Sequence, residues 1–275
     1  MTPTTSVRAQ VLLGLVVAVA SAVTLVISEV AFAVVVAALA ALAYNDFRRL
    51  LGEIAHVTTA VIGGLGVVAL VWCGYVGDLE LIPAVVAGMT LLLLVMRIAL
   101  NEAGRGGVEG VTGDLSTTIG AAATIGVLAA HVVLIRAVDI VGFRGALAFV
   151  IMVVGCEFAA MVVGRTRGRR PLNKAIAPHR TWEGVGAGLV VSVLIGVVVG
   201  LAMDPPFDLR SGVAFGLAVG VLAPIGDLAF AVVKRSAGSR QAPHHPAAAG
   251  AVIEIVDGAL FVAPAFYWAF RTIAL

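Results

Sequence analysis

Long apolar runs in the second half of this chain contain or adjoin four carboxylates, Glu157, Asp227, Glu254 and Asp257. The first three each lie about six or seven residues from one end of their apolar run, which is roughly 10 Å along a helix. Ionisable side chains at that depth in a membrane are costly and usually face a water-filled cavity. Three acids at one depth therefore predict a shared cavity, with three separately paired carboxylates as the alternative.

Basic residues at the mouth of one of these apolar runs indicate phosphate binding. Lys234 and Arg235 follow Asp227, and Lys234 lies two helical turns from Asp227, on the same helix face. Mg²⁺ in proteins is usually held by one or two carboxylates together with substrate phosphates and water. A helix with a deep acid and two cations at its mouth can therefore hold a divalent cation below and phosphate oxygens above.

A second group of cations lies in the polar segment 164–183, where six of the first 17 residues are Arg or Lys and no acid precedes Glu183. Such a loop can orient the protein or bind lipid headgroups. It can also cradle phosphates, because arginine binds phosphate oxygens through two parallel hydrogen bonds. Near its end, Pro178 stops a helix, Thr181 can cap the next helix, and Trp182 is an aromatic residue typical of a membrane interface.

The composition requires lipid around most of these elements. Of the 275 residues, 61% are hydrophobic and only 12% are charged, with a mean hydropathy of +1.09. A soluble domain carries about 25% charged residues, so the expected fold class is an all-α, polytopic transmembrane helix bundle. The formal net charge of +2 is too small to indicate a nucleic-acid partner.

Nine apolar runs are long enough, or nearly so, to cross a bilayer. They cover residues 11–27, 30–44, 57–77, 81–96, 115–135, 145–163, 184–203, 213–233 and 257–273. The second and fourth runs are the shortest, and the last run starts near Ala247 if the apolar residues 247–253 are included, which puts Glu254 about seven residues into it. The first run could also be read as a signal peptide, but it is long enough to span the membrane.

The distribution of positive charge predicts the orientation of these spans. With a cytoplasmic N-terminus and alternating loops, the inside segments hold 14 of the 18 Lys and Arg residues. These are Arg8, Arg48, Arg49, Arg97, Arg105, Arg165, Arg167, Arg169, Arg170, Lys174, Arg180, Lys234, Arg235 and Arg240. The outside segments hold only Arg136, Arg144, Arg210 and Arg271. The positive-inside rule therefore predicts an odd number of spans and an external C-terminus.

Polarity divides the chain in two. Residues 1–156 consist of N-terminal transmembrane helices with little else, whereas residues 157–275 contain the intramembrane acids. The second region also contains the two polar segments 164–183 and 234–250, both expected to be cytoplasmic. Any chemistry is therefore expected in residues 157–275.

Several motifs in the second region resemble those of the phosphatidate cytidylyltransferase family. Glu157 occupies the place of a family acid and is followed by Gly164, Arg165 and Gly168. The family element Thr-Trp-Glu-Gly is present at 181–184. Gly-Asp-Leu at 226–228 and Lys-Arg at 234–235 also match the family spacing. The similarity covers about 119 residues, 157–275, which the resemblance implies to be a cytidylyltransferase-like catalytic region.

The C-terminal signature differs from the family pattern at three places. The family Lys-Asp pair reads Arg240-Gln241, and the His-Gly-Gly element reads Ala-Gly-Ala at 249–251. The family Asp-Arg-x-Asp reads Glu-Ile-Val-Asp at 254–257. Acids therefore remain at the metal positions, while one Asp, one His and one Arg of the signature are replaced.

The resemblance implies roles for individual residues. Transfer of a cytidylyl group from CTP to phosphatidate is the implied reaction, with Mg²⁺ as the cofactor. The implied metal ligands are Asp227, Glu254 and Asp257. The implied catalytic residues are Asp227, Lys234, Arg235 and Asp257. The implied substrate-binding residues are Glu157, Arg165, Arg180, Thr181, Trp182, Glu183 and Arg240.

The expected partners are CTP, phosphatidate or a related lipid phosphate, and the lipid bilayer, with a homodimer left open. The expected location is the cell (inner) membrane, as a multi-pass protein with its active side in the cytoplasm, where CTP is found. Two other functions stay open. A diverged, inactive family member could bind lipid or a protein partner, and a transporter could use the buried acids to carry ions.

Overall fold

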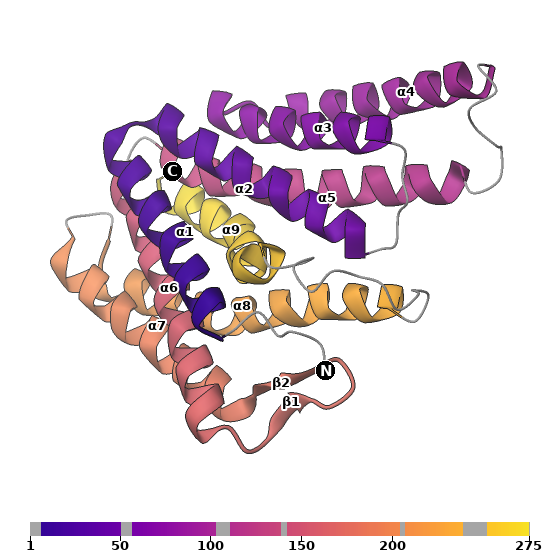
Figure 1. Cartoon of the computed structure of the whole chain (residues 1–275). Coiled ribbons are helices and arrows are strands. Elements are labelled where there is room, and N and C mark those ends of the chain that lie inside the picture. The colour runs from indigo at the N-terminus through magenta and orange to yellow at the C-terminus, as the bar shows by residue number, and fades with distance from the viewer. Residues whose placement is uncertain are drawn as a thin grey trace.

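We describe a computed structural model that covers residues 7–50, 57–102, 111–138, 142–203, 207–238 and 252–274. Over these residues the chain forms nine helices and a two-stranded hairpin (Figure 1). In chain order they are α1 (Val7–Ile27), α2 (Glu29–Leu50), α3 (Val57–Val76), α4 (Leu81–Glu102), α5 (Val111–Ala137), α6 (Gly142–Arg167), β1 (Pro171–Asn173), β2 (Ala177–Thr181), α7 (Trp182–Ala202), α8 (Leu209–Gly238) and α9 (Ile253–Ala274).

Eight of these helices, α2 to α9, are long and apolar enough to cross a membrane. In α1 the apolar stretch is the shorter Leu12–Ile27. The predicted all-α polytopic membrane bundle is therefore confirmed. The helices α2 and α4 end at Leu50 and Glu102, six residues beyond the predicted runs, because an apolar run marks only the part of a helix that lies in lipid.

The two ends of the bundle carry different features. One end carries the hairpin and the first half of α1, whose Gly14 and Leu15 line the same cavity as Arg180 of β2. The other end carries the end of α7 and the start of α8, next to which the rings of Phe207 and Phe270 lie 5.6 Å apart. The helix α9 therefore ends on the side opposite to the start of α1, while the odd number of membrane spans and the external C-terminus stay predictions.

The helices α7 and α8 are antiparallel neighbours that pack closely through small residues, as is common between membrane helices. Gly196 of α7 faces Gly212 of α8 so closely that a Cβ atom on either glycine would clash with the carbonyl oxygen of the other. One turn earlier on α7, the hydroxyl group of Ser192 donates to the carbonyl oxygen of Gly216 at 2.8 Å. This contact fixes the position of α8, and with it Asp227, relative to the hairpin that precedes α7.

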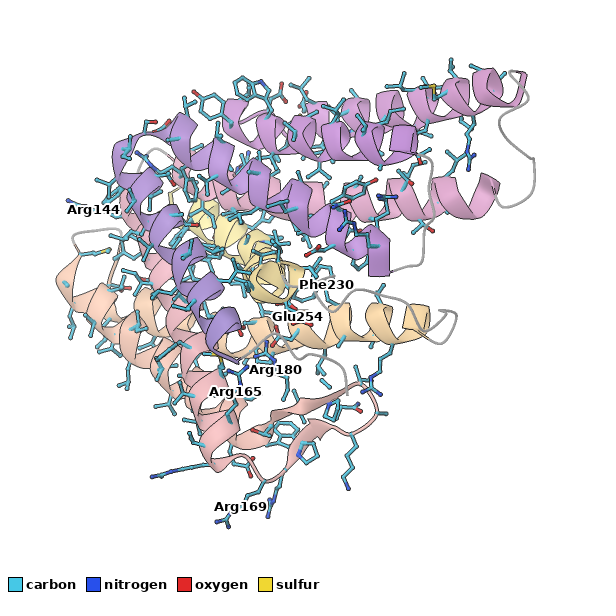
Figure 2. The ribbon with its side chains drawn as sticks, in the orientation of Figure 1. Arg144, Arg165, Arg169, Arg180, Phe230 and Glu254 are labelled. Carbon is cyan, nitrogen blue, oxygen red and sulfur yellow. The ribbon has the colours of Figure 1, made fainter. Side chains whose placement is uncertain are left out.

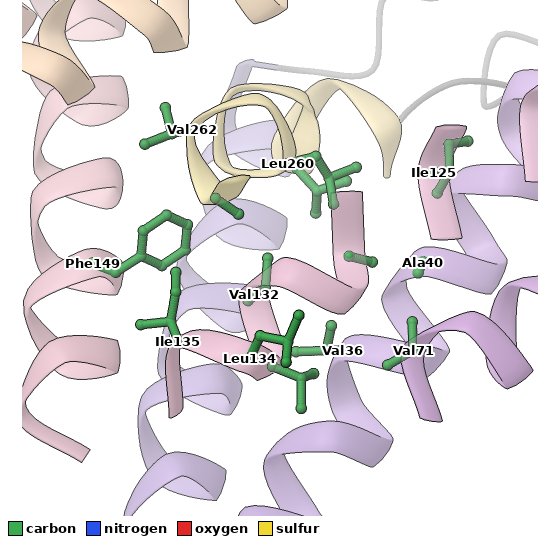
Figure 3. Close-up of a cluster of buried hydrophobic side chains, with 14 of the residues drawn as sticks. Val36, Ala40, Val71, Ile125, Val132, Leu134, Ile135, Phe149, Leu260 and Val262 are labelled. Atoms are coloured by element: carbon green, nitrogen blue, oxygen red, sulfur yellow. The ribbon is translucent and has the colours of Figure 1, made fainter. Parts of the chain in front are cut away.

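The central core lies where α2, α5, α6 and α9 meet (Figure 3). Each helix contributes buried apolar side chains, among them Val36, Val132, Phe149 and Leu260. Toward the Phe207 end of the bundle, the ring of Phe149 lies 5.2 Å from the ring of Phe266. This packing holds α6 and α9, the helices of Glu157 and Asp257, against each other.

The segment 164–183 is partly helical and partly a hairpin. The helix α6 continues to Arg167, and β1 pairs with β2 antiparallel, with Pro171 opposite Thr181. Asn173 closes the turn, because its side-chain oxygen accepts hydrogen bonds from the backbone N–H groups two and three residues later, at 2.8 and 3.0 Å. The sequence did not predict this hairpin, since strands of three and five residues are too short for a clear alternation of polar and apolar residues.

Candidate active site

A cavity of about 790 Å³ lies at the hairpin end of the bundle. Its polar wall contains eight of the residues predicted for the site, contributed by α6, β2, α8 and α9. They are Glu157, Arg165, Arg180, Thr181, Asp227, Arg235, Glu254 and Asp257. Its apolar wall comes largely from α1, α2 and α6 and includes Val17, Val36 and Phe149. The cavity therefore joins a charged region to an apolar one.

Arg180 lies at the centre of the charged region. Its Nη1 atom is 3.1 Å from Oε2 of Glu157, and its Nη2 atom is 2.8 Å from Oδ2 of Asp227. One guanidinium group on the hairpin therefore bridges carboxylates of two different helices. Burial alone would lower the pKa of Arg180, but the charges of the neighbouring carboxylates, Asp227 first, raise this pKa above its usual value.

Two aspartates form the buried part of the site. Asp227 and Asp257 expose only 7% and 6% of their surfaces. Oδ1 of Asp257 accepts a hydrogen bond from the backbone N–H of Gly258 at 2.9 Å. Oδ1 of Asp227 is buried and has no hydrogen-bond partner among the residues that the structure describes. One carboxylate oxygen deep in the cavity is therefore available to a ligand.

Glycines beside the two aspartates allow the helices to approach. A Cβ atom at position 258 would lie 2.6 Å from Oε1 of Glu157, and one at position 226 would lie 2.6 Å from Cβ of Phe261. Gly258 therefore gives the carboxylate of Glu157 its place beside α9. Gly226 lets α8 and α9 pack closely, so that the adjacent Asp227 is held near Asp257.

The hairpin is tied to α6 and α7 by contacts around Thr181, which place Arg180 in the cavity. Thr181 caps α7, since its hydroxyl oxygen accepts a hydrogen bond from the backbone N–H of Gly184 at 3.2 Å. Gly168 packs against Thr181, and a Cβ atom there would lie 2.7 Å from the Thr181 hydroxyl oxygen. The residue that precedes this cap is Arg180, so the cap sets the direction from which its side chain enters the site.

The carboxylate of Glu183 holds the turn between α6 and β1. Its Oε2 atom accepts hydrogen bonds from the backbone N–H groups of Arg169 and Arg170, at 3.1 and 3.2 Å. The neighbouring Trp182 is 59% exposed, and neither Trp182 nor Glu183 lines the cavity. The geometry gives these two residues positions in the scaffold, and their predicted contact with substrate stays a prediction.

The cations of the hairpin region point in two directions. The side chains of Arg165 and Arg180 line the cavity, as Glu254 does, whereas the side chain of Arg169 points away from it (Figure 2). Arg167, Arg169 and Arg170 are exposed outside the cavity. Only part of the positive charge of segment 164–183 therefore reaches the site.

Glu254 lies at the rim of the cavity rather than beside the buried aspartates. Because α9 begins at Ile253, Glu254 is in the first turn of the helix and is exposed. The acids around Arg180 are Glu157, Asp227 and Asp257 instead. The side chain of Lys234 and the whole of Arg240 lie outside the described part of the structure, so their predicted roles stay predictions.

The donor set around Asp227 suits a hard divalent cation. Within the described ranges no three His, Cys, Asp or Glu side chains converge as a ready-made metal site. Mg²⁺ rarely uses such a cage, because it takes one or two carboxylates and completes its shell with phosphate oxygens and water. The unpartnered Oδ1 of Asp227 and the adjacent carboxylate of Asp257 supply that number of protein ligands.

Sequence reasoning missed three features of this site. It did not anticipate that Arg180 bridges two acids, that Gly258 faces Glu157, or that α1 and α2 form the apolar wall. The two Gly–Asp neighbours, Gly226-Asp227 and Asp257-Gly258, were a usable signal, because a glycine beside an intramembrane acid often marks close helix packing.

Comparisons with known proteins place the chain in a family. The model of the cytidylyltransferase family matches residues 8–273. Phosphatidate cytidylyltransferase 4, chloroplastic, of Arabidopsis thaliana is 32% identical over 120 residues, which are 44% of this chain and 30% of the relative. The phosphatidate cytidylyltransferase of Synechocystis is 30% identical over 112 residues, 41% of this chain and 38% of the relative.

A third relative is more distant and matches over a longer segment. The phosphatidate cytidylyltransferase of Bacillus subtilis is 25% identical over 148 residues, 54% of this chain and 55% of the relative. The matched part of the chain thus spans between 30% and 55% of the length of these three curated relatives. Because the family model matches nearly the whole sequence, the chain belongs to the cytidylyltransferase family.

Proposed function

We propose that this chain transfers the cytidylyl group of CTP to phosphatidate, giving CDP-diacylglycerol and pyrophosphate for phospholipid synthesis. An oxygen of the lipid phosphate attacks the α-phosphorus of CTP in line, and the new P–O bond forms as the bond to pyrophosphate breaks. Such a transfer depends mainly on positioning and on neutralisation of charge. The relatives that are named phosphatidate cytidylyltransferase support this choice of substrates.

The observation that carries the proposal is the two-sided cavity. Its charged part holds Arg165, Arg180 and Arg235 together with the buried acids, while its apolar wall continues along α1 and α2. A lipid phosphate has the same two-part character, with an anionic headgroup attached to acyl chains. The cavity can therefore accept a lipid phosphate and a nucleotide triphosphate at the same charged region.

In the proposed reaction, the arginines and the acids of the cavity have different roles. Arg165, Arg180 and Arg235 hold phosphate oxygens of CTP or of the lipid, with Lys234 in the same role. Asp227 and Asp257, with Glu254 at the rim, hold the divalent cation. Mg²⁺, when bound there, supplies a template for the phosphates and neutralises charge that develops during the transfer.

We further propose that the hairpin end of the bundle faces the cytoplasm. CTP is cytoplasmic, so a cavity that takes CTP must be reached from that side. The bias of Lys and Arg toward the segments at this end supports the same orientation. Its similarity to relatives from bacteria supports a location in the cell (inner) membrane.

One other function has a specific observation in its favour. The family signature is altered at Gln241, Ala249 and Glu254, which favours an inactive member that binds lipid or a partner. A transporter is less well supported, because the deep end of the cavity at Phe149 is backed by the packed rings of Phe215 and Phe266, 4.7 Å apart. A transporter needs a path through the membrane, whereas an enzyme needs a cavity that opens on one side only.

The deciding experiment measures incorporation of radiolabelled CTP into lipid. Purified protein is incubated with phosphatidate and labelled CTP, with Mg²⁺ and with EDTA. The enzyme should produce labelled CDP-diacylglycerol only in the presence of Mg²⁺. A folded sample that makes no labelled lipid, and that binds neither CTP nor CDP-diacylglycerol at millimolar concentration, would leave the inactive, partner-binding function.

A further inference from the structure

Arg180 occupies an unusual position for a residue with a proposed role in phosphate binding. In this structure its guanidinium group bridges Glu157 and Asp227, at 3.1 and 2.8 Å. The two carboxylates belong to α6 and α8, while Arg180 belongs to the hairpin. The arginine thus holds two membrane helices from a third element.

The charges around Arg180 do not cancel. Three carboxylates, from Glu157, Asp227 and Asp257, act on one guanidinium group, so the carboxylates outnumber the cation between them. A divalent cation would neutralise them, but Arg180 is already bound to Oδ2 of Asp227. The oxygen Oδ1 of the same carboxylate has no hydrogen-bond partner among the described residues, and a cation bound to it would lie within a few ångströms of a positive charge.

We infer that Arg180 is an internal counter-cation, which weakens divalent-cation binding in the nucleotide-free protein and makes it depend on CTP. This inference rests on the proposed function, because it assumes that CTP and a divalent cation share the cavity. When the site holds no ligand, the charge of Arg180 offsets part of the negative charge of the three carboxylates. When a triphosphate arrives, the guanidinium group has a second anion to bind.

The position of Arg180 allows such an exchange without movement of the helices. The side chain is long, comes from the hairpin and is 21% exposed, whereas the side chain of Asp227 is only 7% exposed. Rotation of the arginine side chain can therefore transfer its hydrogen bonds from Asp227 to a phosphate oxygen. Both oxygens of Asp227 are then free for the cation, whose charge replaces that of the arginine.

This exchange has a thermodynamic consequence. If CTP removes a positive charge from the carboxylates, it raises their affinity for a cation, and the cation must raise the affinity for CTP by the same factor. A permanent Arg180–Asp227 ion pair would give no such contribution. The two possibilities therefore differ in a binding measurement that requires no turnover.

The test uses Mn²⁺ as the probe, in equilibrium dialysis of the full-length protein with protein-bound Mn²⁺ and CTP both counted. No lipid substrate is present, so CTP is not consumed. In Arg180→Gln, Mn²⁺ without nucleotide should bind about tenfold or more tightly than in the native chain, because a like charge within 4–6 Å has been removed. The gain in Mn²⁺ affinity on addition of CTP should be smaller in this variant than in the native chain.

Two matched variants separate the charge of Arg180 from other effects. Arg180→Lys keeps the charge and should bind Mn²⁺ alone about as weakly as the native chain. Arg169→Gln removes a cation of the same hairpin that points away from the cavity (Figure 2), and it should leave Mn²⁺ affinity unchanged. Tight Mn²⁺ binding by Arg180→Lys, or by Arg169→Gln, would contradict the inference.

The outcomes also separate this inference from the proposed function. If the native chain binds Mn²⁺ alone as tightly as Arg180→Gln, and CTP adds nothing, Arg180 is a fixed structural ion pair and the inference is wrong, while CTP-dependent lipid labelling can still succeed. If the native chain binds no Mn²⁺ with CTP present, the proposed metal site itself fails.

The loss of Arg180 could also prevent folding, since it leaves buried acids without a partner. In that case Mn²⁺ should restore a folded, monodisperse Arg180→Gln protein, because the divalent cation replaces the missing charge. If Mn²⁺ does not restore folding, the coupling between CTP and Mn²⁺ in the native chain decides the question, and its absence would overturn the inference.

Discussion

Gly258 of α9 faces Glu157 of α6 so closely that a Cβ atom at position 258 would lie 2.6 Å from Oε1 of the glutamate. This contact matters because Glu157 also holds Arg180, at 3.1 Å. A displaced Glu157 would therefore change the position of the guanidinium group, which the proposed reaction uses to bind phosphate. Because Gly258 of α9 has no side chain, Glu157 has room beside α9 and can hold Arg180 of the hairpin in position.

The first prediction follows from this contact. Gly258→Ala should lower the rate of CTP incorporation by about ten- to hundredfold, since small displacements of positioning groups have effects of that size. The measurement is the lipid-labelling assay, combined with thermal unfolding in detergent. The control is Gly120→Ala in α5, which has no atom within 4 Å of the added methyl group and should keep native activity. Equal activity of the two variants would show that the position of Glu157 is not important.

A second prediction concerns Asp227. Asp227→Asn keeps the size of the side chain but removes the charge that a divalent cation needs. Mg²⁺-dependent turnover should fall by about a hundredfold or more, because a metal-held phosphate contributes several kcal/mol. The matched control is Asp208→Asn at the opposite end of the bundle. Asp208 caps α8 through the backbone N–H of Ser211 at 2.7 Å, and asparagine caps helices equally well. Normal turnover by Asp227→Asn would exclude Asp227 as a metal ligand.

How far the sequence predicts this site can be seen from Asp227 and Arg180. Hydropathy and helical spacing were sufficient to place Asp227 deep in a membrane helix, with cations at the mouth of that helix. The same reasoning could not pair Arg180 with Asp227, because the pairing depends on a hairpin whose strands are too short to be predicted. Local sequence patterns thus predict how deep a residue lies within a helix, whereas contacts between elements can be identified only once the packing of those elements is known.

Glu254 shows a second limit of prediction from local sequence patterns. Its depth was estimated from an apolar stretch that starts near residue 247, but α9 begins at Ile253. The difference of six residues moves Glu254 to the rim and leaves Asp257 among the buried acids. The helix start decides which acid is deep, and apolar composition alone does not show where a helix starts.

The third prediction concerns the packing of α7 against α8. In Gly196→Ala the new methyl group meets the carbonyl oxygen of Gly212, so the two backbones must separate. The free energy of unfolding should fall by about 1–3 kcal/mol, as for other overpacked sites. The control is Gly186→Ala on the same helix, where nothing lies within 4 Å of the new group. Denaturant unfolding in detergent compares the two variants, and equal stability would contradict the close packing.

A fourth prediction concerns orientation in the membrane. Lys174 in the hairpin and Arg210 at the opposite end are both exposed, while the native Cys73 and Cys156 are buried. A membrane-impermeant maleimide added to intact cells should label Arg210→Cys and should label Lys174→Cys only after permeabilisation. Labelling of Lys174→Cys in intact cells would reverse the proposed orientation and put the cavity on the wrong side for CTP.

The last prediction concerns the altered signature. In the family pattern that the sequence resembles, Asp, His and Asp stand where this chain has Gln241, Ala249 and Glu254, so the proposed cation site would have one acid fewer and a longer arm at another position. If the chain is an enzyme, it should need more Mg²⁺ than its relatives or prefer Mn²⁺, which accepts similar oxygen ligands.

Restoring the three residues together tests this explanation. The triple variant Gln241→Asp, Ala249→His, Glu254→Asp should raise turnover and lower the Mg²⁺ concentration needed for half-maximal rate. Glu254→Asp alone should do little, because Glu254 is exposed at the rim and a shorter arm there reaches less far toward Asp227. A native chain that labels lipid at low Mg²⁺, with no gain in the triple variant, would mean that Asp227, Asp257 and the arginines suffice for catalysis and that the altered signature residues are not needed for it.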